Sequence, residues 1–170
     1  LLQWFKMISI IGFTILIEWR SIIKCERSYS EAFIMGILYA LVGLNIQHDA
    51  NHGALSNNSK VNEYLGYTQN YIGGSALMWM YQHIVLHHQF TNNEDFDSDI
   101  QGAGVLRLYK EKTPARWYHK YQNKYIFLLE SFFGYMIVGM TPIELNLNKY
   151  GVIHNLPEVV NKWRKQEIIM

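Results

Sequence analysis

The sequence has one cysteine and almost no net charge. A single cysteine, Cys25, cannot form a disulfide within the chain, and it cannot supply a thiolate-only zinc site or an iron–sulfur cluster. The formal net charge is only +1 over 170 residues, so no overall field attracts nucleic acid or a strongly acidic partner. The single cysteine and the low net charge therefore give no support to a secreted domain held by disulfides or to a nucleic-acid-binding protein.

Apolar residues are abundant but unevenly distributed. The mean hydropathy of −0.07 is low for a chain that lies wholly in lipid, and the apolar residues are instead concentrated in blocks. Residues 1–17 are apolar apart from Gln3, Lys6 and hydroxyl side chains, and residues 32–46 carry no charge. We therefore predict a transmembrane hairpin over residues 1–48. A signal-peptide core or a buried soluble helix are the alternatives for the first block.

The remaining blocks are less regular. Glycines and polar residues interrupt residues 63–81, which we expect to form an interfacial or partly inserted helix. Basic and aromatic residues mix over residues 105–125, which is typical of a surface that faces a membrane. Residues 126–144 are apolar again and could span a bilayer or lie along its surface. The chain begins with leucine inside an apolar run, so we expect it to be a fragment.

Five of the seven histidines fall in two short clusters, Gln47–Gly53 and Gln82–Phe90. On a helix, His48 and His52 lie one turn apart on one face, and His83 and His87 repeat this spacing. His88 would lie about 100° further round an α-helix and could serve a second metal. Since imidazole binds iron, copper and zinc, we predict that the two clusters form halves of one metal site.

The acidic loop after the second cluster has two interpretations. Asp95, Asp97 and Asp99 imitate the start of a calcium-binding loop, but Ile100 and Leu106 stand where that loop needs glycine and an acidic residue. These carboxylates could orient imidazole N–H groups, although a solvated loop is the favoured interpretation for most of them.

The two remaining histidines, His119 and His154, are isolated in the sequence. We expect both to be ordinary interfacial or surface residues.

The two clusters resemble the histidine boxes of membrane fatty acid desaturases. HDANH at 48–52 is similar to the first box of that family, H-x(3,4)-H, and HIVLHH at 83–88 to the second, H-x(2,3)-H-H. The sequence around the boxes resembles the front-end acyl desaturases, and within them those acting at Δ5. It includes the stretches QHDANHGALS and LHHQFTN. A third box and a cytochrome b5 domain, which the family pattern includes, are absent from this sequence.

The resemblance implies an all-α, membrane-embedded desaturase domain, here incomplete. Its parts would be a transmembrane hairpin (1–48), a cytosolic histidine-box region (49–125) and a membrane-spanning or interfacial segment with a tail (126–170). A non-haem centre of two iron ions would use O₂ to introduce a cis double bond into an acyl-CoA or acyl-lipid chain. Cytochrome b5 would donate electrons, and the boxes would face the cytosol from the endoplasmic reticulum. The implied iron ligands are His48, His52, His83, His87 and His88.

Three rival functions remain open on the sequence. Related membrane diiron hydroxylases use similar boxes. A zinc protease would need H-E-x-x-H, and Asp49 replaces that glutamate with a shorter side chain. A degenerate, non-catalytic membrane protein could use the same histidines only for hydrogen bonding.

Overall fold

A computed structural model describes residues 2–24, 28–93, 95–97, 99, 105–107, 114–132 and 135. All regular secondary structure in those residues is helical, which confirms the all-α prediction for that part of the chain. The chain forms two compact units, Leu1–Ala76 and Leu77–Met170.

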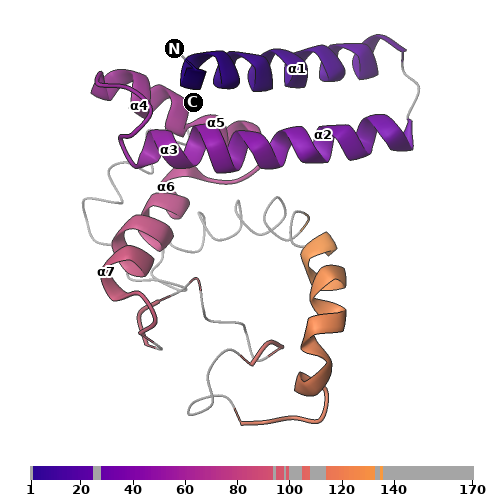
Figure 1. Cartoon of the computed structure of the whole chain (residues 1–170), viewed down its shortest axis with the longest axis vertical. Helices are drawn as coiled ribbons and strands as arrows, with labels where there is room; N and C mark the ends of the chain where they lie inside the picture. Colours follow the sequence, from indigo (N-terminus) through magenta and orange to yellow (C-terminus); the bar gives the residue numbers. More distant parts are fainter. Residues whose placement is uncertain are drawn as a thin grey trace, which may run out of the picture. The chain divides into compact units, whose positions relative to one another are not determined.

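The first unit is built on a helical hairpin. Helix α1 (Leu2–Lys24) runs antiparallel to α2 (Tyr29–Val42), as Figure 1 shows. Helix α2 continues without a break through a π-helical turn, η1 (Gly43–Gln47), into α3 (His48–Asn51). Two antiparallel helices lie where the hairpin is predicted, and the second leads directly into the first histidine box. That the hairpin crosses a membrane stays a prediction.

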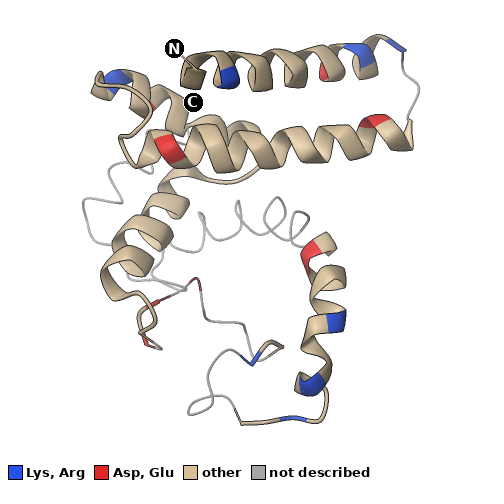
Figure 2. Cartoon of the chain, viewed as in Figure 1, with Lys and Arg blue, Asp and Glu red and all other residues tan. Residues whose placement is uncertain are grey.

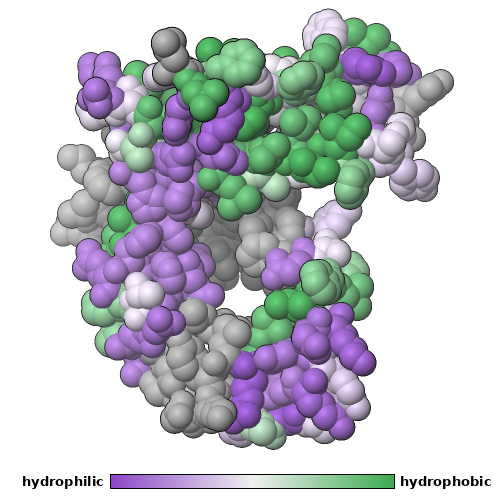
Figure 3. Space-filling view, in the orientation of Figure 1, coloured by the Kyte–Doolittle hydropathy of each residue, from purple (hydrophilic) through white to green (hydrophobic). Residues whose placement is uncertain are grey.

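Helices α1 and α2 expose many of their large apolar side chains, and the polar Thr14 is buried. Phe5, Phe13 and Phe33 are 71%, 60% and 70% exposed. Thr14 is buried and donates a hydrogen bond of 2.7 Å to the carbonyl of Ile10. Green, hydrophobic side chains gather over the middle of α1 and α2 in Figure 3. This arrangement is typical of helices that face lipid, because a water-facing surface would carry polar groups.

Charged residues occur only towards the ends of the two hairpin helices. No charge lies between Lys6 and Glu18 or between Glu31 and Asp49, and Figure 2 shows both helices tan through their middle. Of the residues that the structure describes, one helix, Tyr29–Asn51, is long and apolar enough to cross a membrane by length and composition.

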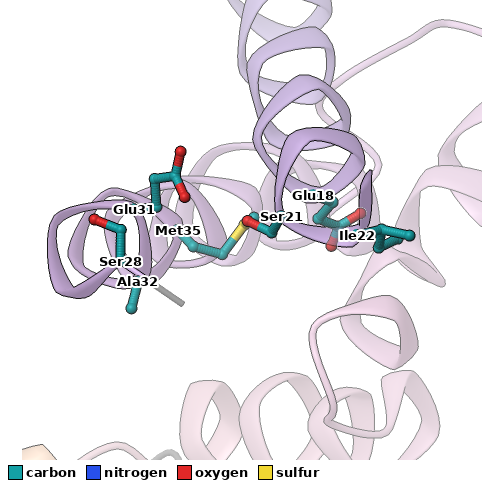
Figure 4. Close-up of a pocket in the computed structure, with 7 residues that line it drawn as sticks. All are labelled: Glu18, Ser21, Ile22, Ser28, Glu31, Ala32 and Met35. Carbon is teal, nitrogen blue, oxygen red and sulfur yellow. The ribbon is translucent and has the colours of Figure 1, made fainter. Parts of the chain in front are cut away.

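The closed end of the hairpin holds a groove and a small ionic cluster. Glu31 accepts from Arg20 at 3.4 Å and lies 3.9 Å from the ammonium of Lys24. A groove of about 620 Å³ lies beside this cluster, and in Figure 4 Met35 of α2 extends across it towards α1. The groove is lined by Glu18, Ser21, Ile22, Ser28, Glu31, Ala32 and Met35.

Two short helices pack against the end of the hairpin. Helices α4 (Ser59–Gly66) and α5 (Thr68–Tyr71) contact η1, and α4 also contacts α3. Asn58 caps α4 by accepting the N–H of Lys60 at 3.0 Å. The buried core of this unit comprises Met7, Ile10, Val42, Ile46, Ala50 and Leu55.

The second unit carries the second histidine box on a continuous helical rod. Helix α6 (Ala76–Trp79) runs into a π-helical segment, η2 (Met80–His87), and then into α7 (His88–Phe90). Thus the expected single helix over 63–81 is wrong, because α4, α5 and α6 are separated near Gly66 and by Gly73, whose φ of 94° ends helical geometry.

Further along, a short 3₁₀ helix, η4 (His119–Tyr121), leads into a helix over residues 122–132. Its apolar side chains Phe127 and Phe132 are 75% and 57% exposed. The remainder of the apolar block 126–144, except 135, and the tail with His154 lie outside the described residues.

Candidate metal centre

The first histidine box places two imidazoles side by side. The ring centroids of His48 and His52 are 4.5 Å apart, and the N–H of His52 bonds the carbonyl of His48 at 3.1 Å. The predicted i, i+4 pairing is confirmed. The N–H of His48 bonds the carbonyl of Gly43, five residues earlier, so the box begins on a widened turn.

Helix α1 makes polar contacts with this box and with the turn before it. Nδ1 of His48 lies 3.2 Å from Oδ1 of Asp49, and Nε2 of Gln3 donates to Oδ2 of the same carboxylate at 3.1 Å. Beside this pair, Lys6 donates to Oδ1 of Asn45 at 3.0 Å. Sequence reasoning missed Gln3 because the contact joins residues 46 positions apart, and no periodicity relates them.

The second box brings three imidazoles together within the second unit. The ring centroids of His83 and His87 are 5.3 Å apart, and the two ring planes are nearly parallel, at 18°. The centroid of His88 lies closer to His83, at 4.7 Å, than that of His87 does. The ring of His88 is roughly perpendicular to that of His83, at 84°, and the prediction that His88 serves a second metal stays a prediction. In the π-helical turn η2 the N–H of His88 bonds the carbonyl of His83, so His88 follows His83 by one wide turn.

Two aspartates of the following loop bond the second box. Nδ1 of His83 lies 2.8 Å from Oδ2 of Asp99, and Nδ1 of His87 lies 2.8 Å from Oδ1 of Asp97. Gln82 also donates to Asp99 at 3.2 Å. For the buried Asp97 the solvated-loop interpretation is thus wrong. Asp99 is exposed, as that interpretation expects, and it also bonds an imidazole.

Asp97 is fully buried and accepts hydrogen bonds from three groups. Besides His87, it accepts the backbone N–H of Asn92 at 2.7 Å and that of Asp99 at 3.1 Å. Burial alone would raise the pKa of Asp97, but the hydrogen bonds from His87 and these two N–H groups hold the pKa below its usual value. The carboxylate is therefore ionised at neutral pH and accepts at both oxygens.

The chemistry of these donors fits a transition metal bound by imidazole. With Nδ1 of a histidine held by a carboxylate, Nε2 is the nitrogen that can bind a metal, and the carboxylate fixes the ring and raises its basicity. His48, His83 and His87 have this arrangement. The predicted ligands are thus grouped as His48 with His52 in one unit and His83, His87 and His88 in the other.

His119 has a different environment from the box histidines. It is buried, and its Nδ1 accepts the backbone N–H of Arg116 at 3.1 Å, closing a local turn. Its burial contradicts the expectation of a surface position, whereas the interfacial alternative stays a prediction. Its role is structural, because the acceptor nitrogen that a metal would need is already used.

Comparisons with known proteins identify the family of the chain. The family model for fatty acid desaturases matches residues 29–165. The acyl-lipid (7-3)-desaturase of Diacronema lutheri is 37% identical over 142 residues, which are 84% of this chain and 32% of that protein. The chloroplastic acyl-lipid (7-3)-desaturase of Chlamydomonas reinhardtii is 40% identical over 58% of this chain and 19% of its own length.

A third relative covers a similar part of the chain. The sn-1 linoleoyl-lipid 6-desaturase of Arthrospira platensis is 35% identical over 69% of this chain and 30% of its own length. The chain spans less than a third of the length of each of these three relatives. No solved structure gives a significant match.

Proposed function

Since the chain belongs to the fatty acid desaturase family, we propose that it is part of a membrane acyl-lipid desaturase. The protein would introduce a cis double bond into an unsaturated acyl chain, with two non-haem iron ions and O₂. The ligands would be the five histidines of the two boxes. One observation carries this proposal: His83 and His87 are stacked at helical spacing, and each is bonded at Nδ1 by its own aspartate.

The iron ions and the carboxylates beside the box histidines would have different roles. When bound, the iron pair supplies the oxidising chemistry that removes hydrogen from unactivated methylene groups. Asp97 and Asp99 keep the rings of His87 and His83 in one orientation and one tautomer. Asp49 does the same for His48. No side chain has to act as a nucleophile.

Apolar residues next to the second box fit an acyl substrate. Leu77 and Met78 are buried and pack with Tyr81, one to two turns before His83. A dry apolar wall near the ligands would bind methylene groups and exclude water. The names of the relatives support an acyl-lipid rather than an acyl-CoA substrate. These names differ in the position of the new double bond, so the proposed Δ5 preference rests on the sequence resemblance.

The hairpin supports a place in a membrane. We propose that both α1 and α2 cross the bilayer, since large apolar side chains point outwards from both. The endoplasmic reticulum with cytosolic boxes, and cytochrome b5 as electron donor, complete the proposal. A chloroplastic relative makes the plastid the other location to test, by fluorescence of the tagged full-length protein.

Lipid analysis of cells that express the full-length gene tests the function. We expect a new polyunsaturated product with one more double bond when dihomo-γ-linolenic acid is fed. His52→Ala or His87→Ala should abolish this product and leave membrane insertion intact, because each removes a ligand.

The matched control is His119→Gln, which changes a histidine outside the boxes and keeps an acceptor for Arg116. Activity that survives either box substitution would count against the ligand assignment. An alcohol in place of a double bond would identify a hydroxylase, and zinc with peptidase activity would identify a protease.

A further inference from the structure

The first turn of α1 makes two polar contacts with the helix that carries the first histidine box. Gln3 and Lys6 lie three residues apart on α1 and reach Asp49 and Asn45, which lie four residues apart on the opposite helix. Figure 1 shows the start of α1 beside α3, where these contacts form. Both contacts join residues about forty positions apart, so they depend on how the hairpin closes.

The two contacts differ in what they hold. Lys6 ends on Asn45, whose own amide donates to the carbonyl of Leu41 at 3.3 Å. Gln3 ends on Oδ2 of Asp49, and the other oxygen of that carboxylate faces Nδ1 of His48. Gln3, Asp49 and His48 are therefore linked by consecutive polar contacts. The contacts of Lys6 and Asn45 instead end at the carbonyl of Leu41.

We propose that Gln3 is a positioning residue of the first histidine box. By donating to one oxygen of Asp49, it turns the other oxygen towards Nδ1 of His48 and so presents Nε2 of that ring to the metal. This inference rests on the proposed function, because it concerns the metal that the box would hold.

The first box needs such a brace more than the second. Asp97 is fully buried and accepts two backbone N–H groups besides His87, so the protein backbone fixes it. The side chain of Asp49 is 29% exposed, and its partners among the described residues are His48 and Gln3. Without Gln3 the carboxylate could rotate towards water and release His48.

Substitutions of Gln3 can test the hydrogen-bond donor of its amide separately from the size of its side chain. Gln3→Glu keeps the size of the side chain but loses its N–H donors and places a second negative charge against Asp49. Gln3→Lys restores a donor with a charge that suits the carboxylate. Lys6→Met is the matched control, because it removes the neighbouring contact between the same two helices.

The experiment uses the full-length protein, purified with iron in detergent. Iron per chain, the rate of iron release to a chelator and the Mössbauer spectrum are measured for the wild type and the three variants. We expect Gln3→Glu to release iron from one of two sites about 10 to 100 times faster, the range seen when a group that orients a metal-binding histidine is lost. Gln3→Lys and Lys6→Met should stay close to the wild type.

The outcomes separate this inference from the proposed function. If the wild type binds no iron, the proposed function fails. If the wild type holds iron but Gln3→Glu releases it at an unchanged rate, only the positioning role fails. Equal acceleration in Lys6→Met would show that Gln3 merely holds the helices together, and would overturn the inference, as would the absence of any recovery in Gln3→Lys.

Discussion

The side chain of Asp97 combines complete burial with three donors, namely Nδ1 of His87 and the N–H groups of Asn92 and Asp99. A buried carboxylate is tolerated only when such bonds replace its hydration. The same residue therefore folds the loop and orients an imidazole. Substitution at this position should weaken both.

We predict that Asp97→Asn weakens iron binding at the second box by about 10- to 100-fold, because His87 loses its anionic acceptor. The new amide would also face a backbone N–H with a donor, which should cost about 1–3 kcal/mol of stability. Iron retention against a chelator and thermal unfolding of the full-length protein measure the two effects.

Asp95→Asn is the control, since it makes the same chemical change at an exposed position of the same loop. It should leave iron retention within about twofold of the wild type, as expected for a surface substitution. Equal losses from Asp95→Asn and Asp97→Asn would mean that loop charge, rather than the contact with His87, supports the site.

Among the elements, the π-helical turns coincide with the two boxes. η1 ends at the residue before His48, and η2 contains both His83 and His87. A wide turn is less favourable than an α-helical one and is often found at functional sites. Here the ring centroid of His88 lies 4.7 Å from that of His83, closer than the centroid of His87, at 5.3 Å.

The contact between α4 and α3 depends on a glycine. A Cβ added at Gly66 would overlap Oδ1 of Asn51 and lie 3.0 Å from its Cγ. We predict that Gly66→Ala destabilises the first unit by about 1–3 kcal/mol, because the added Cβ forces the side-chain amide of Asn51, a residue of the first box, to shift. Thermal unfolding with and without iron measures the effect.

Gly36→Ala provides the comparison, because an added Cβ there meets nothing within 4 Å. It should be neutral or stabilise α2 by up to about 1 kcal/mol through helix propensity. A Gly66→Ala protein as stable as Gly36→Ala would show that the overlap with the Asn51 amide does not lower the stability of the first unit.

Helix α2 can be tested as a membrane span by one charge. Ile37 is 47% exposed near the middle of the Tyr29–Asn51 helix. We predict that Ile37→Lys lowers the inserted fraction, at a cost of about 3 kcal/mol, because lysine is disfavoured at the centre of a bilayer. Glycosylation mapping of the full-length protein in microsomes measures insertion.

Tyr29→Lys at the start of α2 is the control, since Tyr29 is 97% exposed and a lysine there can reach the interface. It should insert like the wild type. If Ile37→Lys also inserts normally, α2 faces water, and the proposed membrane hairpin is wrong.

At the scale of the whole molecule, the two boxes belong to different compact units, Leu1–Ala76 and Leu77–Met170. A shared iron pair would couple them, because a ligand bound by both stabilises both by linkage. At a hundredfold excess over its dissociation constant, a ligand adds about 2.7 kcal/mol of stability. If the proposed function is right, iron binding should therefore stabilise the two units cooperatively.

We predict that iron removal raises amide hydrogen exchange in residues 43–52 and 80–90 together. His83→Ala should abolish the iron-dependent protection of residues 43–52, although it lies in the other unit. Hydrogen exchange with mass spectrometry on the full-length protein, with His119→Gln as the control, measures this. Protection of residues 43–52 that persists in His83→Ala would mean that the boxes serve separate sites.

The sequence by itself determined the family, the helical hairpin and the pairing of histidines one turn apart. These follow from residue identity and short-range periodicity, and the rings of His48 and His52 indeed lie 4.5 Å apart. A helix places residues i and i+4 on one face wherever it forms, so spacing alone predicts the pair.

Only the tertiary structure decided which side chains brace those histidines. Gln3 meets Asp49 because α1 folds back along α2, and Asp97 meets His87 because the loop after α7 turns back on itself. The wide turn that gathers His88 depends on one backbone hydrogen bond that no residue pattern encodes. Such contacts are set by the closure of the chain in three dimensions, and spacing along a single helix therefore could not predict them.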